Sequence, residues 1–183
     1  MSFERLETAL EGPILFEVSA NEDPRGFLSE SWREDMMEAL GIDCGFVQEN
    51  HSRSIKGTLR GIHFQTSPGQ AKLVRCARGT ILDVAVDLRK DSPTYKSWEG
   101  FELSDENRRQ LLVPVGFGHA FCVLSDEADV IYKLSSYYDQ ETEAGIAWDD
   151  PEIDIEWPAM SRLVSDRDDN APSLAEIEAD LPW

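Results

Sequence analysis

Short apolar runs separated by turn residues follow one another through most of the chain. The run 81–88 has the clearest pattern, because its alternation places Leu82, Val84, Val86 and Leu88 on one face of a strand. Strands are predicted at 14–18, 27–32, 46–52, 58–64, 71–77, 80–88, 98–103, 110–113, 118–124 and 130–136. Many short strands at this spacing predict one all-β domain over residues 1–183, built as a sandwich, jelly roll or barrel.

Helices are predicted only at the periphery of this domain. The segment 33–40 has a helical pattern and is followed by Gly41, a residue that commonly ends helices. Near the C-terminus, Ser173 and Glu176 have the spacing of a capping box, which predicts the start of a short helix.

Composition narrows the classes of function. The 183 residues contain 36 acidic and 17 basic side chains, a net charge of −19, and 41% are hydrophobic. This apolar content is typical of a folded protein, and so acidic a chain disfavours binding to nucleic acid or to a membrane surface. No apolar run suggests a signal peptide or a spanning helix. Cys44, Cys76 and Cys122 lack paired spacing and are expected to be reduced, as in a cytoplasmic protein.

The charge is unevenly distributed. From residue 51 to residue 82 the chain has no Asp or Glu, although acids make up about one residue in five overall. The same window contains His51, His63 and six basic residues: Arg53, Lys56, Arg60, Lys72, Arg75 and Arg78. Two interpretations remain open at this point: a basic surface that pairs with acids elsewhere, or a pocket for a small anion such as a diphosphate.

Two of the three histidines occur in motifs like those of the cupin superfamily, a group of jelly-roll barrels. His63 lies in Gly-Ile-His-Phe-Gln65, and His119 follows Pro-Val-Gly-Phe-Gly. The metal-binding form of the first motif has a second histidine where this chain has Gln65, followed by an acid, and here the next acid is Asp83. An amide is a poor ligand for a transition metal, so the barrel is predicted without a metal site.

A longer series of blocks resembles the dTDP-4-dehydrorhamnose 3,5-epimerase (RmlC-like) family over nearly the whole chain. The blocks are 25–30, 46–52, 56–65, 70–75, 83–89, 114–121, 131–138, 148–151, 155–158 and 164–168. The resemblance implies a cupin-like barrel that uses no cofactor and acts on a dTDP-4-keto-6-deoxyhexose, by removing a proton from one ring face and returning one to the other.

The resemblance also implies residue roles. His63 is the expected base, Asp168 orients it, Tyr132 is the acid, and Lys72 stabilises the enolate oxygen. Substrate binding falls on the remaining family positions: Arg25, Phe27, Glu30, Gln48, Asn50, Arg60, His119, Tyr138, Glu143 and Arg167. Family members are dimers with strands crossing between subunits, and a homodimer is expected here too.

Departures from the family pattern leave alternatives open. Arg167 replaces the usual lysine, Val164 replaces a leucine, and Gly118 and Ala120 alter the block around His119. These changes leave the chemistry intact but make regiospecificity an open question. A mono-epimerase acting at C3′ or C5′ alone is therefore a second hypothesis. A non-catalytic sugar-nucleotide binder and a metal-dependent cupin enzyme are the others.

Overall fold

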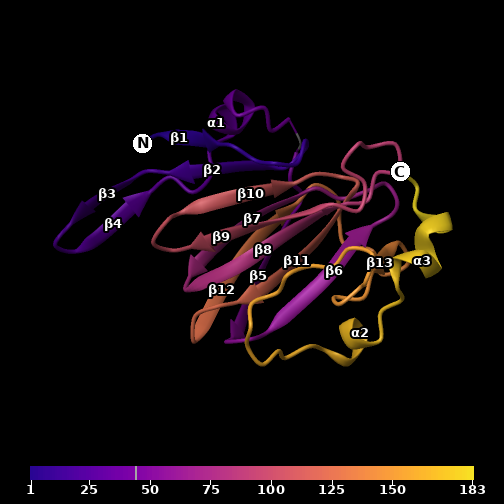
Figure 1. The fold of residues 1–183 in the computed structure, drawn as a ribbon. Coiled ribbons are helices and arrows are strands. Elements are labelled where there is room, and N and C mark those ends of the chain that lie inside the picture. Colours follow the sequence, from indigo (N-terminus) through magenta and orange to yellow (C-terminus); the bar gives the residue numbers. More distant parts are fainter. Residues whose placement is uncertain (44) are drawn as a thin grey trace.

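The chain forms two antiparallel sheets that face each other, with one hairpin extending beyond them (Figure 1). The computed structural model describes residues 1–43 and 45–183, so Cys44 lies outside the described residues. This architecture confirms the predicted all-β, jelly-roll (cupin-like) barrel with short peripheral helices. Among the described residues, no helix is long and apolar enough to cross a membrane.

The elements are short throughout. In spatial order, the first sheet contains β1 (Phe3–Leu6), β2 (Ile14–Val18), β10 (Arg109–Val113), β7 (Lys72–Arg78), β12 (Glu127–Leu134) and β5 (Gln48–Ile55). The second contains β13 (Glu143–Gly145), β6 (Leu59–Gln65), β11 (Phe117–Val123), β8 (Thr80–Asp87) and β9 (Trp98–Ser104). The hairpin is β3 (Ala20–Asp23) with β4 (Gly26–Ser29). The helices are α1 (Glu34–Ala39), α2 (Asp166–Asp169), α3 (Leu174–Ile177) and the 3-10 turn η1 (Glu178–Asp180).

Strand β8 shows why the second sheet is buried on both faces. The predicted apolar face of Leu82, Val84, Val86 and Leu88 packs against the C-terminal segment outside the barrel. The alternate residues point into the barrel, where Ile81 and Ala85 join the core between the sheets. That inner core takes apolar residues from both sheets, among them Val74, Leu111, Val130, Phe117 and Phe121.

Two peripheral layers cover the outer faces of the sheets. Helix α1 contributes Met37 to a cluster with Phe16 and other apolar residues on the outer face of the first sheet. On the other side, the segment after β13 lies along the second sheet and buries Leu174 of α3 (Figure 1). Both predicted helices are confirmed, including the capping box between Ser173 and Glu176.

Several strand predictions need correction at their ends. The run 27–32 forms a strand only to Ser29, and 130–136 forms one that begins at Glu127 and ends at Leu134. The strand predicted at 46–52 runs from Gln48 to Ile55, because Ile55 still pairs with Glu127. Strands β1, β3 and β13 have too few apolar residues to have been predicted from alternation.

Gly61 allows β6 to approach β11 closely. Its φ is +123°, and a Cβ atom there would lie 2.5 Å from the Ala120 Cβ and 2.6 Å from the His119 carbonyl oxygen. Real side chains do not tolerate such contacts, so only glycine fits. The close approach pairs His63 with His119 across the two strands.

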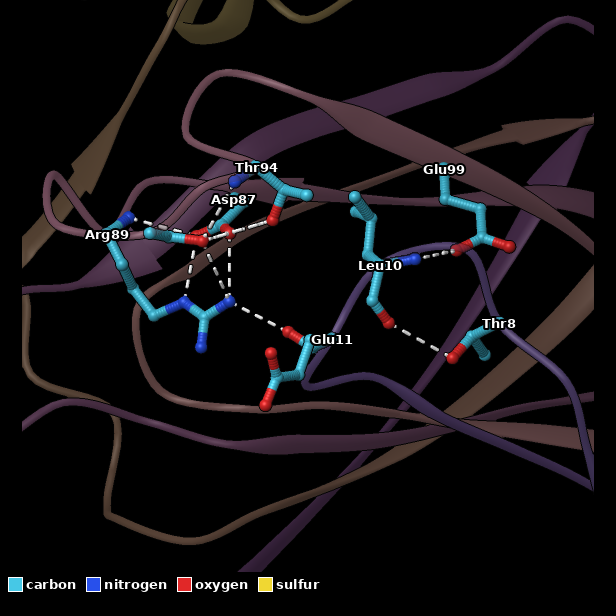
Figure 2. Close-up of polar contacts among 8 residues, drawn as sticks. Thr8, Leu10, Glu11, Asp87, Arg89, Thr94 and Glu99 are labelled. Atoms are coloured by element: carbon cyan, nitrogen blue, oxygen red, sulfur yellow. Dashed lines mark hydrogen bonds and ion pairs between the residues drawn. The ribbon is translucent and has the colours of Figure 1, made fainter.

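A buried carboxylate at the end of β8 is fully satisfied by hydrogen bonds (Figure 2). Asp87 accepts from Arg89 Nε and Nη2 at 2.9 and 2.8 Å, and from the hydroxyls of Ser92 and Thr94. Burial alone raises the pKa of Asp87, but these hydrogen bonds outweigh it and hold the pKa below its usual value. Arg89 also donates to the Glu11 carbonyl oxygen at 2.7 Å, so the cluster fastens the loop after β1 to the barrel.

Candidate active site

A cavity of about 430 Å³ opens between the two sheets. It collects all the predicted site residues that lie outside the hairpin region: Gln48, Asn50, Arg60, His63, Lys72, His119, Tyr132, Tyr138, Glu143, Arg167 and Asp168. They come from both sheets and from the C-terminal segment, positions far apart in the sequence.

His63 and Asp168 form a hydrogen-bonded pair at one wall. The Nε2 atom of His63 lies 2.7 Å from Asp168 Oδ1, and the backbone N–H of Gly61 donates to Asp168 Oδ2 at 3.3 Å. Asp168 is only 5% exposed, and its own N–H donates to Ser165, the N-cap of α2. Burial raises the pKa of Asp168, but the hydrogen bond and charge of His63, the N–H of Gly61 and the charge of Arg167 together outweigh burial, so the net pKa is lowered. The carboxylate therefore holds the proton on Nε2 and leaves Nδ1 free to act as a base.

Tyr132 approaches the cavity from the opposite sheet. It lies on β12 and His63 on β6 of the other sheet, so the two side chains flank the space between the sheets. Its neighbour Asn50 donates to the phenolic oxygen at 3.2 Å, and the side-chain amide of Gln48 in turn donates to Asn50 Oδ1 at 3.0 Å. Because the phenolic oxygen already accepts a hydrogen bond, its own hydrogen is available to a ligand.

Lys72 reaches the cavity from the middle of the first sheet. Its Nζ donates to the His63 carbonyl oxygen at 3.3 Å. Burial lowers the pKa of Lys72 to about 8, partly offset by the carboxylates of Glu143 and Asp83. An ammonium group in such surroundings stabilises a developing negative charge strongly, because little water screens it.

A second histidine–carboxylate pair lies beside the first, and one of its members was missed from the sequence. His119 Nε2 lies 3.0 and 3.1 Å from the two oxygens of Asp83, a residue with 0% exposure. Burial lowers the pKa of His119, although Asp83 opposes this effect. The available signal was the alternation of 81–88, which points Asp83 into the barrel rather than toward the apolar outer face.

The mouth of the cavity holds an ion pair. Arg167 Nη2 lies 2.8 Å from Glu143 Oε2, and the Tyr138 hydroxyl donates to the same oxygen at 2.8 Å. Tyr138 is 48% exposed, and its backbone N–H donates to Gln48 Oε1. The mouth therefore presents a guanidinium and an open aromatic surface, both suited to a nucleotide.

Three predicted binding residues lie away from this cavity in the single chain. Arg25 and Phe27 belong to the projecting β3–β4 hairpin and its turn, and Glu30 follows it (Figure 1). The Arg25 side chain is 90% exposed and pairs only locally with Asp23, while Phe27 is 60% exposed. Within one chain, the fold therefore leaves these three residues apart from the residues that line the cavity.

The basic residues of the acid-free window divide between the cavity and the outer face of the first sheet. His63, Arg60 and Lys72 line the cavity. On the outer face of the sheet, Arg53 binds Asp129 at 2.7 and 2.8 Å, and Arg78 pairs with Glu127 at 3.2 Å. Cys76 and Cys122 are buried free thiols, and burial raises the pKa of Cys76 to about 12.

An antiparallel barrel with a histidine–aspartate pair on one wall and a tyrosine on the other has the groups that acid–base catalysis on a bound molecule requires, and this is the class of enzyme that the site fits. The sequence model for dTDP-4-dehydrorhamnose 3,5-epimerase matches residues 7–176. The chain belongs to this family of isomerases, as the motifs predicted.

Individual relatives agree over nearly the whole chain. A dTDP-4-dehydrorhamnose 3,5-epimerase of Shigella flexneri is 47% identical over 94% of this chain and 97% of its own. The crystal structure of a Legionella pneumophila dTDP-6-deoxy-D-glucose-3,5-epimerase, in complex with dTDP-4-keto-L-rhamnose, superposes with a TM-score of 0.94 at 42% identity, covering 98% and 97% of the two chains. A dTDP-4-dehydrorhamnose 3-epimerase of Streptomyces niveus is also 47% identical, over 84% of this chain and 75% of its own.

Proposed function

We propose that this chain converts dTDP-4-dehydro-6-deoxyglucose to dTDP-4-dehydrorhamnose by inverting C3′ and C5′. The observation that carries the proposal is the placement of His63 with Asp168 and of Tyr132 on opposite walls of one cavity. Inversion at carbon needs a base on one face of the ring and an acid on the other. In this proposal, residues 1–183 form a single domain that contains the whole cavity.

Each inversion is a pair of proton transfers. The C4′ carbonyl acidifies the neighbouring C–H bond, His63 Nδ1 takes the proton, and the electron pair moves onto the carbonyl oxygen as an enolate. The Lys72 ammonium, with Arg60 nearby, stabilises that oxygen. Tyr132 then gives its hydroxyl proton to the opposite face of the same carbon as the carbonyl reforms. The imidazolium of His63 then loses its proton to solvent and the phenolate of Tyr132 takes one from solvent, which restores both groups before the second carbon reacts. Asp168 orients His63 and favours the imidazolium formed during the step. No metal or cofactor takes part in this scheme.

The nucleotide half of the substrate binds at the mouth and the hairpin. Arg167 is the proposed donor, His119 offers Nδ1 as an acceptor because its Nε2 is bound to Asp83, Tyr138 offers its ring, and the polar groups of Gln48, Asn50 and Glu143 complete the contacts. Arg60 and Lys72 add positive charge near the diphosphate. These basic groups attract a small anion although the whole chain carries a net charge of −19.

Incubation of the protein with dTDP-4-dehydro-6-deoxyglucose in deuterium oxide tests this function. Deuterium is expected at both C3′ and C5′ with inversion at each, measured by proton NMR and mass spectrometry. Deuterium at one carbon only would establish the mono-epimerase, which the 47% identity to the Streptomyces niveus 3-epimerase keeps as the second candidate. Retention of both protons, with the ligand bound, would leave a sugar-nucleotide binder. Unchanged turnover after dialysis against a chelator separates this mechanism from a metal-dependent one.

We further propose a homodimer in which the hairpin of each subunit completes the site of the other. Strand β5 lies at one edge of its sheet and carries Gln48 and Asn50, and an exposed edge is a template for pairing with another strand. The hairpin extends from the barrel with Phe27 and Leu28 exposed at 60% and 67%. A hairpin that crosses to a second copy would cover both surfaces and bring Arg25, Phe27 and Glu30 to a cavity.

Mixing two inactive variants tests the exchange of hairpins. Neither Arg25→Ala/Phe27→Ala nor His63→Ala should turn over substrate efficiently alone. After joint refolding in equal amounts, about half of the dimers are mixed, and each mixed dimer has one site with both a wild-type His63 and a wild-type hairpin. About a quarter of all sites are then intact, so activity should return to about a quarter of the wild-type value. If the hairpin serves its own subunit, mixing gives no recovery. A monomer by light scattering would also contradict the proposal.

A further inference from the structure

The cavity has an apolar side chain beside Lys72 for which the proposed proton transfers have no use. Most of the described residues that line the cavity are polar or charged, and two, Phe121 and Leu134, have side chains without a polar atom. Leu134 is 2% exposed, but the described residues that form the apolar core between the sheets do not include it. A buried leucine that faces a polar cavity offers its apolar surface to whatever fills that cavity.

Strand pairing fixes the place of Leu134 in the cavity. On β12 it pairs with Lys72 of β7 on one side and with Gln48 of β5 on the other. Directly paired residues of neighbouring strands point to the same face of a sheet, with their Cβ atoms about 5 Å apart. Phe121 lies elsewhere, because on β11 it pairs with Arg60 of β6. The cavity therefore has one apolar group beside the lysine and another beside the arginine.

The next side chain along the strand from Lys72 is polar. Gln70 is 9% exposed and lines the same cavity. Its Nε2 donates to Gln65 Oε1 at 3.2 Å and to the Ser136 carbonyl oxygen at 3.0 Å, so both of its N–H bonds are used. The side-chain oxygen is the group that it offers a ligand, and this oxygen accepts from a hydroxyl group. The surroundings of Lys72 thus combine an apolar neighbour with a hydrogen-bond acceptor.

The substituents of the sugar differ in the same way. In a 4-keto-6-deoxyhexose, C3′ on one side of the carbonyl carries a hydroxyl group, and C5′ on the other side carries the C6′ methyl group. C1′, which carries the diphosphate, lies across the ring from C4′. With the C4′ oxygen at Lys72 and the diphosphate at Arg60, the methyl group lies at the lysine end of the cavity, away from Phe121. Leu134 is the apolar side chain at that end.

We propose that Leu134 is the subsite for the C6′ methyl group and selects a 6-deoxy sugar over one with a C6′ hydroxyl group. The inference rests on the proposed function for the direction of the sugar in the cavity. A hydroxyl group placed against Leu134 loses its hydrogen bonds to water and gains no partner, which weakens binding. Gln70 favours the same orientation by accepting a hydrogen bond from the C3′ hydroxyl group.

Two unreactive ligands that differ by one oxygen atom, dTDP-6-deoxyglucose and dTDP-glucose, test this selection. In calorimetric titrations the wild type should bind the 6-deoxy ligand about 10- to 100-fold more tightly. Leu134→Ala should bind it about tenfold more weakly and prefer it by less than about threefold, because the apolar contact is lost and the C6′ hydroxyl group gains room for water. The affinity for dTDP alone should not change.

A direct measurement uses the wild-type protein and does not depend on the folding of this variant. In the complex with dTDP-6-deoxyglucose, intermolecular NOEs should join the C6′ protons to the methyl groups of Leu134, assigned with the volume-conserving Leu134→Met. NOEs from C6′ to Phe121 in place of Leu134 would overturn the inference. Equal affinity of the wild type for the two ligands would overturn it as well.

Leu111→Ala is the matched control. Leu111 is a leucine of the same sheet and is 0% exposed, but it belongs to the core between the sheets and pairs with Val74. This variant should lose thermal stability and keep the wild-type preference. An unchanged preference in folded Leu134→Ala contradicts the inference. A wild type that shows the preference and the NOEs but incorporates no deuterium into the 4-keto sugar would instead refute the proposed function and leave the methyl subsite standing.

Discussion

The variant His63→Ala is expected to lose deuterium incorporation and inversion together, with kcat lowered roughly 10²- to 10⁴-fold. The reason is that Asp168 holds Nε2 of His63 at 2.7 Å and leaves Nδ1 free to remove the proton from carbon. Without this base the first proton transfer stops, and all later steps depend on it. The measurement is proton NMR of the sugar in deuterium oxide, with single-turnover rates at matched pH. Dissociation constants for dTDP should change little, because the diphosphate contacts remain.

His51→Ala is the control for this experiment. His51 is on β5, the strand before β6 in the chain, but its side chain is 56% exposed and faces Asp129 at 3.5 Å on the outer surface of the other sheet. Turnover in this variant should stay within about twofold of wild type, as is usual for surface substitutions. Incorporation of deuterium by a folded His63→Ala protein at the wild-type rate would contradict the role of His63 and point to a different base.

The second large effect is expected in Tyr132→Phe, and it differs in kind. His63 can still take the proton and return it to the same face, so exchange with solvent should continue while inversion falls roughly 10²- to 10⁴-fold. The product of a long incubation in deuterium oxide should be labelled starting sugar with its configuration retained. The loss of one hydroxyl leaves the packing of Tyr132 against the inner core intact.

Tyr137→Phe is the comparison for this second variant. Tyr137 is 70% exposed, and its backbone carbonyl oxygen, which a substitution of the ring leaves in place, accepts the hydrogen bond from Gln65. Exchange and inversion should both remain near wild type in this protein. If Tyr132→Phe inverts the sugar as fast as it exchanges protons, another group must supply the acid, and Tyr132 is then only part of the wall.

Alternation of apolar residues was sufficient to predict strands whose two faces are both packed. β2 was predicted with its observed ends, and the outer face of β8 was predicted residue by residue. It failed where pairing rather than burial defines the strand. β13 has three residues and exists because Glu143, Ala144 and Gly145 pair with β6. Helix α2 was missed for a related reason, since its four residues have no apolar periodicity.

The site residues were predicted chiefly through motifs. The features of the site that the motifs did not predict have physical causes. His63, Tyr132, Lys72 and Asp168 meet at one cavity although a hundred residues separate some of them, a convergence that local patterns do not specify. Asp83 was overlooked because the alternation of 81–88 places it on the inner face of its strand but does not identify its partner, His119. The hairpin residues Arg25 and Phe27 lie away from the cavity of their own chain, so a site that uses them requires the proposed second subunit, whose position one sequence does not give.

The C-terminal segment that wraps the second sheet has a consequence for the timing of synthesis. Asp168 and Arg167 follow β13, the last strand, so the ribosome completes the barrel strands before it adds the residues that orient His63. Because a domain generally folds as a unit, the earlier strands are expected to reach their final packing only after this segment, which also covers the outer face of the second sheet, has been synthesised.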